Sequence, residues 1–527
     1  MNNIFIYIGD DILDVSPKTV VALTYQTGGV GDIRGRTISR TNGFNVDKTE
    51  NNIRIFGHAN EIKSSSLIPY RRIVCRILID GIQVLKGYAY IKETKETFNV
   101  SVYENVIDFY SRIDGLTLRD IDFGDTGITW NASYIDSVRA ATSGFVSPVI
   151  QYGQIDASLA NAEIGSVYLP SVYFHTIVTA LFTNAGYTIS GDILTDDNYL
   201  NLIVPYSYND WPGTSITMNL VMPDVKQHDF IKNFLMMFGL ILVENNGDIE
   251  IKSFESLLTN RADSYDWTEK RNTAISDKIE YIFGGYAQKN YFSWADVISR
   301  EDASFTYTNN GFLEIDNENI DAESDIFSSV FGIGEDGFDA NNAADVINGC
   351  TIPVWTSGIP TAYPETQPFD EEPVARLALV RTRVSGEPAV LFNSNSRTDY
   401  LVGYFSNLSP TFKTLRWDDA SASTEGLISI YYNKLQSSIS RAKMIERYYS
   451  LSLVDIATIR MYNLVYDDSD YFYIHKIDNF VVGKLTKVIL FKIEGYPIAH
   501  DPITYSLLPG VGEVIFTGLR PSVFVLS

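Results

Sequence analysis

Carboxylates gathered in one stretch are the residues of this chain with the clearest chemical capacity. Residues 301–375 contain 16 of the 65 Asp and Glu residues and no Lys or Arg. Clustered oxygen atoms are the ligands that Ca²⁺ prefers, so a calcium site is one interpretation. The acids do not follow the order D-x-D-x-D-G of a calcium loop, and we favour a solvated acidic surface. The candidate calcium ligands are Asp316, Glu318, Asp321 and Glu323.

Other patterns that support catalysis are not found in the sequence. The five His residues lie at 58, 175, 228, 475 and 500, too far apart for a local zinc pair. There is no G-x-S-x-G, G-x-x-x-x-G-K-[ST] or H-E-x-x-H, and the Gly-rich TGGVG of residues 27–31 is interpreted as a turn. A carboxylate pair that cleaves glycosides stays open as an alternative, because its separation in space defines it. We therefore predict no catalytic residues and no cofactor.

Charge and aromatic content narrow the class of function. With 41 Lys and Arg against 65 Asp and Glu, the chain has a net charge of −24. Nucleic-acid binders need a basic surface, so binding of DNA or RNA is not expected. An acidic surface would instead repel the DNA phosphates. The 33 Tyr and 29 Phe suit strands and subunit contacts. Rings in YYNKLQ and ERYYSL are also suited to stacking on sugars, which leaves glycan binding as an alternative.

The two cysteines and the apolar runs indicate a protein made in a cytoplasm. Two cysteines, Cys75 and Cys350, are too few for a disulfide framework. Cys75 alternates with Ile77 and Ile79 on a strand face, so we expect a buried, inert thiol rather than a reactive one. The start MNNIFIYIGD lacks the basic residues of a secretory signal. The longest apolar run, Phe234 to Val243, is too short to span a bilayer, so no membrane span is expected.

The elements that position these residues begin with a β-rich region. In Arg76 to Ile91, two alternating strands meet at Asp80-Gly81, which suits a type I′ hairpin turn. TVVALTYQTGGV and ETFNVSVYENV predict further strands. Several short strands in 1–125 predict a small barrel or sandwich.

Helical spacing occurs at three later places. The first helix is expected to start near Pro170 and Ser171 and to stop at Gly186. The second, HDFIKNFLMMFG, ends at Gly239 and precedes a hairpin with Asn246-Gly247 as its turn. The third is EGLISIYYNKLQSSISRA. Strands are expected in YTISGDIL, SITMNLVM, KMIERYYSLSL and KLTKVILFKI, and a hairpin or arm in GEVIFTGLRPSVFVLS.

These patterns predict a β-rich α+β, multidomain protein, with small β-barrel or sandwich domains and a few packed helices. The expected parts are an N-terminal β-barrel-like domain (1–125), an α+β domain (126–225), a helix-hairpin β domain (226–300), an irregular, partly extended acidic insertion (301–375) and a C-terminal α+β domain (376–527).

The order of several segments resembles a known family. DVSPKTVVALTYQTGGVGDI, GFNVDKTENNIRIFGHANEI, PYRRIVCRILIDGIQVLKGYAYI and DFYSRIDGLTLRDIDF follow one another as in tail and baseplate structural proteins of phages that infect Bacteroidota. More remotely, the order is similar to baseplate hub proteins of tailed phages, as is FIKNFLMMFGLILVENNGDIEIKSF. The acidic segment 301–375 departs from the hub pattern.

The resemblance implies a virion structural protein of the phage tail that transforms no substrate. It implies a homo-oligomeric ring, a trimer or a hexamer-like ring, that contacts other tail proteins while DNA passes without specific binding during genome ejection. The alternatives are a glycan-binding receptor module and a tailspike glycosidase. The acids expected to face a DNA channel are Asp316, Glu318, Asp321, Glu323 and Asp325.

Overall fold

The computed structural model describes most of the chain between residues 3 and 493. The described residues are 3–26, 40–41, 43–104, 106–150, 169–206, 215–245, 248–281, 285–295, 310–333, 346–347, 350–351, 374–382, 390–392, 395–397, 401–404, 415–419, 425–440 and 443–493. The TGGVG stretch, His500 and the expected C-terminal hairpin or arm lie outside the described residues.

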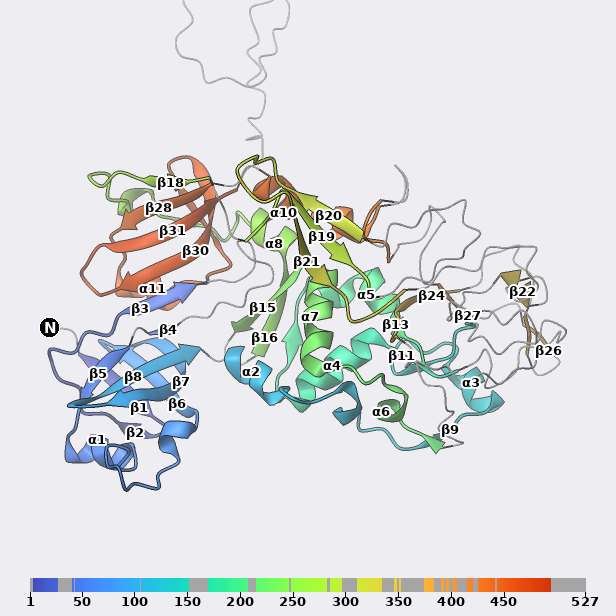
Figure 1. Ribbon diagram of the computed structural model, residues 1–527, viewed down its shortest axis with the longest axis horizontal. Coiled ribbons are helices and arrows are strands. Elements are labelled where there is room, and N and C mark those ends of the chain that lie inside the picture. Colours follow the sequence, from blue (N-terminus) through green and yellow to red (C-terminus); the bar gives the residue numbers. More distant parts are fainter. Residues whose placement is uncertain are drawn as a thin grey trace, which may run out of the picture.

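The fold is a β-rich α+β arrangement of several sheets, as the sequence predicted. Its largest sheet has 14 strands, and their order brings strands from before residue 105 beside strands from after residue 443. Figure 1 shows the N-terminal strands in blue and the C-terminal strands in red, with β3 between them. From one edge to the other, the path is β18 (Lys278–Glu280), β28 (Met444–Tyr449), β31 (Thr486–Lys492), β30 (Asp470–Phe480), β3 (Leu23–Gln26), β4 (Arg40–Thr41), β8 (Thr97–Glu104), β7 (Ile82–Thr94), β6 (Ile73–Ile79), β1 (Ile4–Ile8) and β2 (Asp11–Ile12).

Three further strands join this sheet at its sides. Strand β5 (Phe44–Asp47) pairs with β8, and β29 (Leu464–Asp467) pairs with both β30 and β17 (Tyr265–Asp266). Short helices α1 (Glu50–Ile55) and α11 (Leu453–Thr458) bury Ile55 and Ile456 in the same apolar core. That core also contains Ile6, Val46, Phe98, Ile474, Val488 and Leu490.

The predicted hairpin at Asp80-Gly81 is confirmed. Strands β6 and β7 pair antiparallel from Ile73↔Ala89 to Ile79↔Ile82. Asp80 and Gly81 have φ values of 48° and 82°, and positive φ at both central residues is what a type I′ turn requires. Cys75 is fully buried on the inner face of β6, as expected.

A second core is built around helices. Helix α4 (Phe174–Asn184) and helix α7 (Gln227–Met237) contribute buried aromatic rings, and the Phe174 and Phe230 ring centroids lie 4.6 Å apart. The predicted stop of α4 at Gly186 is confirmed by its φ of 81°. The predicted start was wrong: Ser171–Tyr173 form strand β11, which pairs with β13 (Leu202–Val204), so the helix begins only at Phe174.

The helix-hairpin unit predicted after residue 226 is confirmed. Gly239, with φ of 58°, follows α7 and leads into β15 (Leu240–Asn245) and β16 (Asp248–Ser253). The turn residues 246–247 lie outside the described residues. Strand β12 (Ile189–Ser190), expected within YTISGDIL, adds to this hairpin by parallel pairing with β16.

Two other predictions are corrected by tertiary contacts. In SITMNLVM only β14 (Ser215–Ile216) is a strand; the rest forms α6 (Met218–Val221), whose first amide donates to the Asp125 carboxylate at 2.8 Å. The helix expected in EGLISIYYNKLQSSISRA is two helices, α9 (Leu427–Tyr431) and α10 (Asn433–Ile439). They part at Tyr432, which is fully buried and donates its hydroxyl to the Met236 carbonyl at 2.6 Å.

The remaining described elements are short. The helices are α2 (Val106–Arg112), α3 (Ala132–Val138), α5 (Asp197–Asn201) and α8 (Phe254–Thr259), with 3-10 turns η1 (Ile68–Tyr70), η2 (Leu118–Asp120), η3 (Asp192–Thr195) and η4 (Thr268–Lys270). The strands are β9 (Ile128–Thr129), β10 (Phe145–Val146), β19 (Lys289–Ser293), β20 (Asn310–Glu314), β21 (Glu323–Ser328), β22 (Val346–Ile347), β23 (Cys350–Thr351), β24 (Ala378–Thr382), β25 (Val390–Phe392), β26 (Asn395–Arg397) and β27 (Leu401–Tyr404). Within the described part, no helix has the length and apolarity needed to cross a membrane.

The junction after α7 gives a test of the fold. A Cβ at Gly239 would lie 2.7 Å from the Tyr431 carbonyl oxygen, whereas a Cβ at Gly81 would meet nothing within 4 Å. Both glycines have positive φ, so Ala at either site costs about 1–2 kcal/mol from the backbone alone. We expect Gly239→Ala to lower the thermal midpoint clearly more than Gly81→Ala. Equal shifts in thermal unfolding would contradict the close approach of α9 to Gly239.

Candidate interaction surfaces

The predicted acidic residues lie on a three-stranded sheet. Its strands are ordered β20-β19-β21, and β20 and β21 both pair with β19. The inner face buries Phe292, Leu313 and Phe327 against the helical core. Residues 310–333 are therefore more regular than the irregular insertion expected from composition, because alternate apolar side chains give them a core to pack on.

The outer face of this sheet combines aromatic rings with carboxylates. The rings of Tyr291 and Phe312 meet edge to face, with centroids 5.6 Å apart, and the Phe312 side chain is 40% exposed. Lys289 lies between Glu314 and Glu323 in the pairing register. We name this surface the acidic aromatic face: Lys289, Tyr291, Phe312, Glu314, Glu323 and Asp325.

One hydrogen bond links a ring of this face to an acid. The Tyr291 hydroxyl donates to the Glu323 carboxylate at 3.2 Å. Partial desolvation, and after it this hydrogen bond, raises the pKa of the Tyr291 phenol. The phenol therefore stays protonated at neutral pH and keeps a donor directed at Glu323.

The five acids singled out in the sequence are all exposed, but they divide between two positions. Three lie in the connection between β20 and β21, and two lie on β21 itself; in chain order they are Asp316, Glu318, Asp321, Glu323 and Asp325. No group of three or more metal-ligating side chains occurs among the described residues. Calcium binding and a channel-facing role for these acids stay predictions.

A second surface, which sequence reasoning missed, lies on the outer face of the N-terminal strands. Cross-strand neighbours share a face, and here Val74 pairs with Tyr88, which pairs with Tyr103. The Tyr90 and Tyr103 rings stack with centroids 5.3 Å apart, and their hydroxyls lie 3.0 Å apart. The signal in the sequence was the alternation of Tyr88 and Tyr90 in KGYAYI, which predicted a strand but not which side stays open.

Cations surround these rings. Arg76 pairs with Lys86 across the strands, and its guanidinium lies 5.0 Å from the Tyr7 ring centroid. At one end, η1 adds Tyr70, which is 86% exposed. A groove of about 350 Å³ runs along this end, lined by Tyr70, Arg71, Arg72, Tyr88, Tyr90 and Tyr103. We name the whole surface the basic tyrosine face: Tyr7, Tyr70, Arg71, Arg72, Val74, Arg76, Lys86, Tyr88, Tyr90 and Tyr103.

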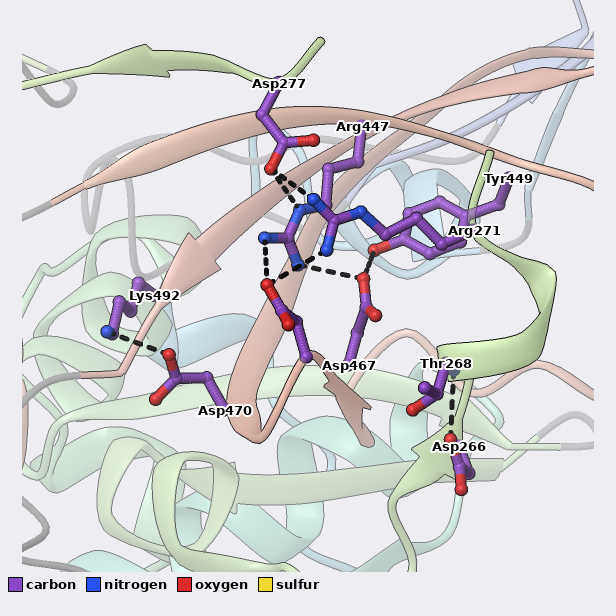
Figure 2. A network of polar contacts seen from close by, with 10 residues as sticks. Asp266, Thr268, Arg271, Asp277, Arg447, Tyr449, Asp467, Asp470 and Lys492 are labelled. Carbon is purple, nitrogen blue, oxygen red and sulfur yellow. Dashed lines mark hydrogen bonds and ion pairs between the residues drawn. The ribbon is translucent and has the colours of Figure 1, made fainter. Parts of the chain in front are cut away.

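A buried polar network holds the C-terminal strands to the segment that carries η4 and β18. Figure 2 shows Arg447 between two carboxylates: its Nη1 donates to Asp467 at 2.8 Å and its Nε donates to Asp277 at 2.9 Å. Asp467 also accepts from the Tyr449 hydroxyl at 2.6 Å, and Arg271 donates to Asp277 at 2.8 Å. The Asp467 side chain is only 1% exposed.

Most donors and acceptors of the network pair with one another, and only the Nε of Arg271 is a buried atom of the network without a hydrogen-bond partner in the described structure. Burial alone would lower the pKa of Arg447, but the hydrogen bond to Asp277 and the nearby carboxylates hold that pKa above its usual value. Burial, and then the hydrogen bond to Asp467, raises the pKa of Tyr449. Both groups therefore keep fixed charge states, and the strands β28 and β29 keep one register relative to the 265–280 segment.

His175, His475 and Cys75 lie in separate surroundings. A ring nitrogen of His175 lies 2.9 Å from the Thr142 carbonyl, and burial lowers the pKa of His175. Burial also lowers the pKa of His475. Burial raises the pKa of Cys75 to about 12, so its thiol stays protonated.

Comparison with known proteins finds similarity only at the level of structure. No family model and no curated protein matches the chain. It is similar to a 43 kDa tail protein of prophage MuSo2 from Shewanella oneidensis, with 9% identity, a TM-score of 0.35, and coverage of 93% of this chain and 98% of that one. A prophage tail protein from Listeria monocytogenes has 8% identity and a TM-score of 0.36, covering 93% and 95%. A chain of the phage P2 baseplate has 10% identity and a TM-score of 0.23, covering 94% and 100%.

The buried network predicts a large difference between two adjacent acids. Asp467→Asn removes the charge that faces Arg447 and is expected to lower the free energy of unfolding by about 3 kcal/mol, because one partner of a buried pair is lost. Asp468→Asn is the matched control, since the Asp468 side chain is 65% exposed and should contribute less than about 1 kcal/mol. Chemical denaturation followed by tryptophan fluorescence measures both. Equal effects would show that the network does not hold the strands.

Proposed function

We propose that this chain is a structural component of a phage tail or baseplate that assembles into a homo-oligomeric ring. The observation that carries the proposal is the presence of two exposed faces on which charged side chains lie beside aromatic rings. Such faces have the composition of protein interfaces, where Tyr and Arg are enriched. The order of the sequence segments that resemble tail and baseplate proteins supports the same role, and it also favours a Bacteroidota host.

The proposed mechanism is mechanical and transforms no molecule. Described strands from the N-terminal and C-terminal parts of the chain, β1 and β31 among them, lie in one sheet, which supplies contact faces for sister subunits and for other tail proteins. Repetition of the same contact closes a ring when a whole number of subunits completes one full rotation. A chain with net charge −24 lets DNA pass without binding it, because like charges repel. The exposed acids from Asp316 to Asp325 add to that repulsion where they face the DNA path.

A glycan-binding tail module is the second candidate, and the tyrosine groove favours it. Stacked Tyr90 and Tyr103 offer a flat apolar surface, and Arg71 and Arg72 at the groove offer donors for acidic sugars. Binding of host capsular polysaccharide to the purified chain, lost in Tyr90→Ala, would favour this candidate over a purely structural one.

The first proposal predicts where the chain is found. In purified phage particles, quantitative mass spectrometry should detect it at a fixed copy number relative to other tail proteins. Deleting its gene in the phage should give particles without complete tails in electron micrographs, and the wild-type gene supplied in trans should restore them. Normal, infective tails without the chain would contradict the proposal.

A further inference from the structure

We propose that the basic tyrosine face of one copy docks on the acidic aromatic face of a second copy. This inference deepens the ring proposed above by naming its contact surfaces, and it rests on that proposed function. The two faces lie on different sheets: one on β1, β6, β7 and β8, the other on β19, β20 and β21 (Figure 1). The contact is therefore head to tail.

The basic tyrosine face is an apolar and cationic surface in an acidic chain. Val74 is 48% exposed and Tyr70 86%, although both lie beside other apolar or aromatic side chains. The cations Arg71, Arg76 and Lys86 lie around them. In a chain with a net charge of −24, a surface where cations gather is attracted to an acidic surface of another copy.

The acidic aromatic face has the matching composition. Its centre is the Tyr291 and Phe312 pair, and its carboxylates Glu314, Glu323 and Asp325 are exposed around that pair. Lys289, whose ammonium lies 5.2 Å from the Phe312 ring centroid, is the one cation of this face, so its three carboxylates leave an excess of negative charge that complements the basic tyrosine face. Rings supply the buried area of such a contact, and the opposite charges steer the encounter and fix its register.

The occupant is a second copy because this chain itself carries the complementary face. A head-to-tail contact between two different faces produces a ring if the rotation closes and a filament if it does not. With this docking, Glu323 and Asp325 lie between subunits, so only Asp316, Glu318 and Asp321 of the five acids remain available to face the DNA path. Unlike a channel lining, the acids between subunits are required for assembly.

Charge reversal tests the contact through the oligomeric state. The first variant is Arg71→Glu with Arg76→Glu and Lys86→Glu; the second is Glu314→Lys with Glu323→Lys and Asp325→Lys. A control reverses three exposed acids outside both faces: Asp114→Lys, Glu255→Lys and Glu269→Lys. Mass photometry and light scattering at 0.15 M salt measure association of the full chain. Each face variant should weaken self-association about 100-fold or more, because like charges then meet, while the control should not.

Mixing the two face variants separates a lost contact from a misfolded chain. In the mixture, the retained acidic face of the first variant fits the retained basic face of the second, and the reversed faces also fit each other. Association should therefore return in the mixture although neither variant associates alone. A mixture that stays monomeric would overturn the proposal.

Other outcomes also decide it. If the face variants assemble like the wild type, the proposed docking is overturned, although a ring formed through other surfaces remains compatible with the result. If the first variant then also loses binding to capsular polysaccharide, the basic tyrosine face is assigned to a glycan. A wild-type chain that stays monomeric at 100-fold the concentration used for the variants would overturn association through these faces. The presence of the chain in purified particles tests the tail role separately.

Discussion

Pairing of β3 with β30 is the contact on which the rest of the structure depends. It joins Leu23 to Phe480 and Tyr25 to Ile477, residues more than 450 positions apart, and all four side chains are buried. The N-terminal and C-terminal strands contribute side chains to one apolar core across this seam. Loss of the seam would expose two unpaired strand edges and the apolar side chains behind them.

The buried ion network extends this rigidity to the middle of the chain. Asp277 and Arg271 come from the segment between η4 and β18, whereas Arg447 and Asp467 come from the C-terminal strands, so the network ties the two together (Figure 2). Asn233 and Ser329 make a comparable buried hydrogen bond of 2.5 Å between α7 and the end of β21. The basic tyrosine face and the acidic aromatic face are therefore held by sheets whose register is fixed, which is the property that a repeated subunit contact needs.

The local turns and helix ends could be predicted from the sequence, but the long-range contacts could not. Asp80-Gly81 and Gly239 have conformations that only a few residue types adopt, so the hairpin and the end of α7 could be predicted. The β3–β30 seam leaves no local signal, because both strands read as ordinary alternating segments. The break at Tyr432 depends on the carbonyl of Met236, far away in the chain, and a helical pattern alone does not reveal it.

For the candidate surfaces, the sequence predicted which acids are exposed but not the sheets that carry them. The exposure of the five acids followed from their density, but the sheet beneath Glu323 and Asp325 depends on pairing with β19, which composition does not show. The open side of Tyr88 and Tyr90 depends on what the opposite side of β7 packs against.

The central claim is that this chain acts through rigid faces that contact sister subunits. A cryo-electron microscopy reconstruction of the intact particle tests it most directly. We expect a ring of this chain in the tail, with Tyr88 of each copy beside Phe312 of the next. A reconstruction in which the chain occupies no ring, or in which both residues face solvent in every copy, would contradict it.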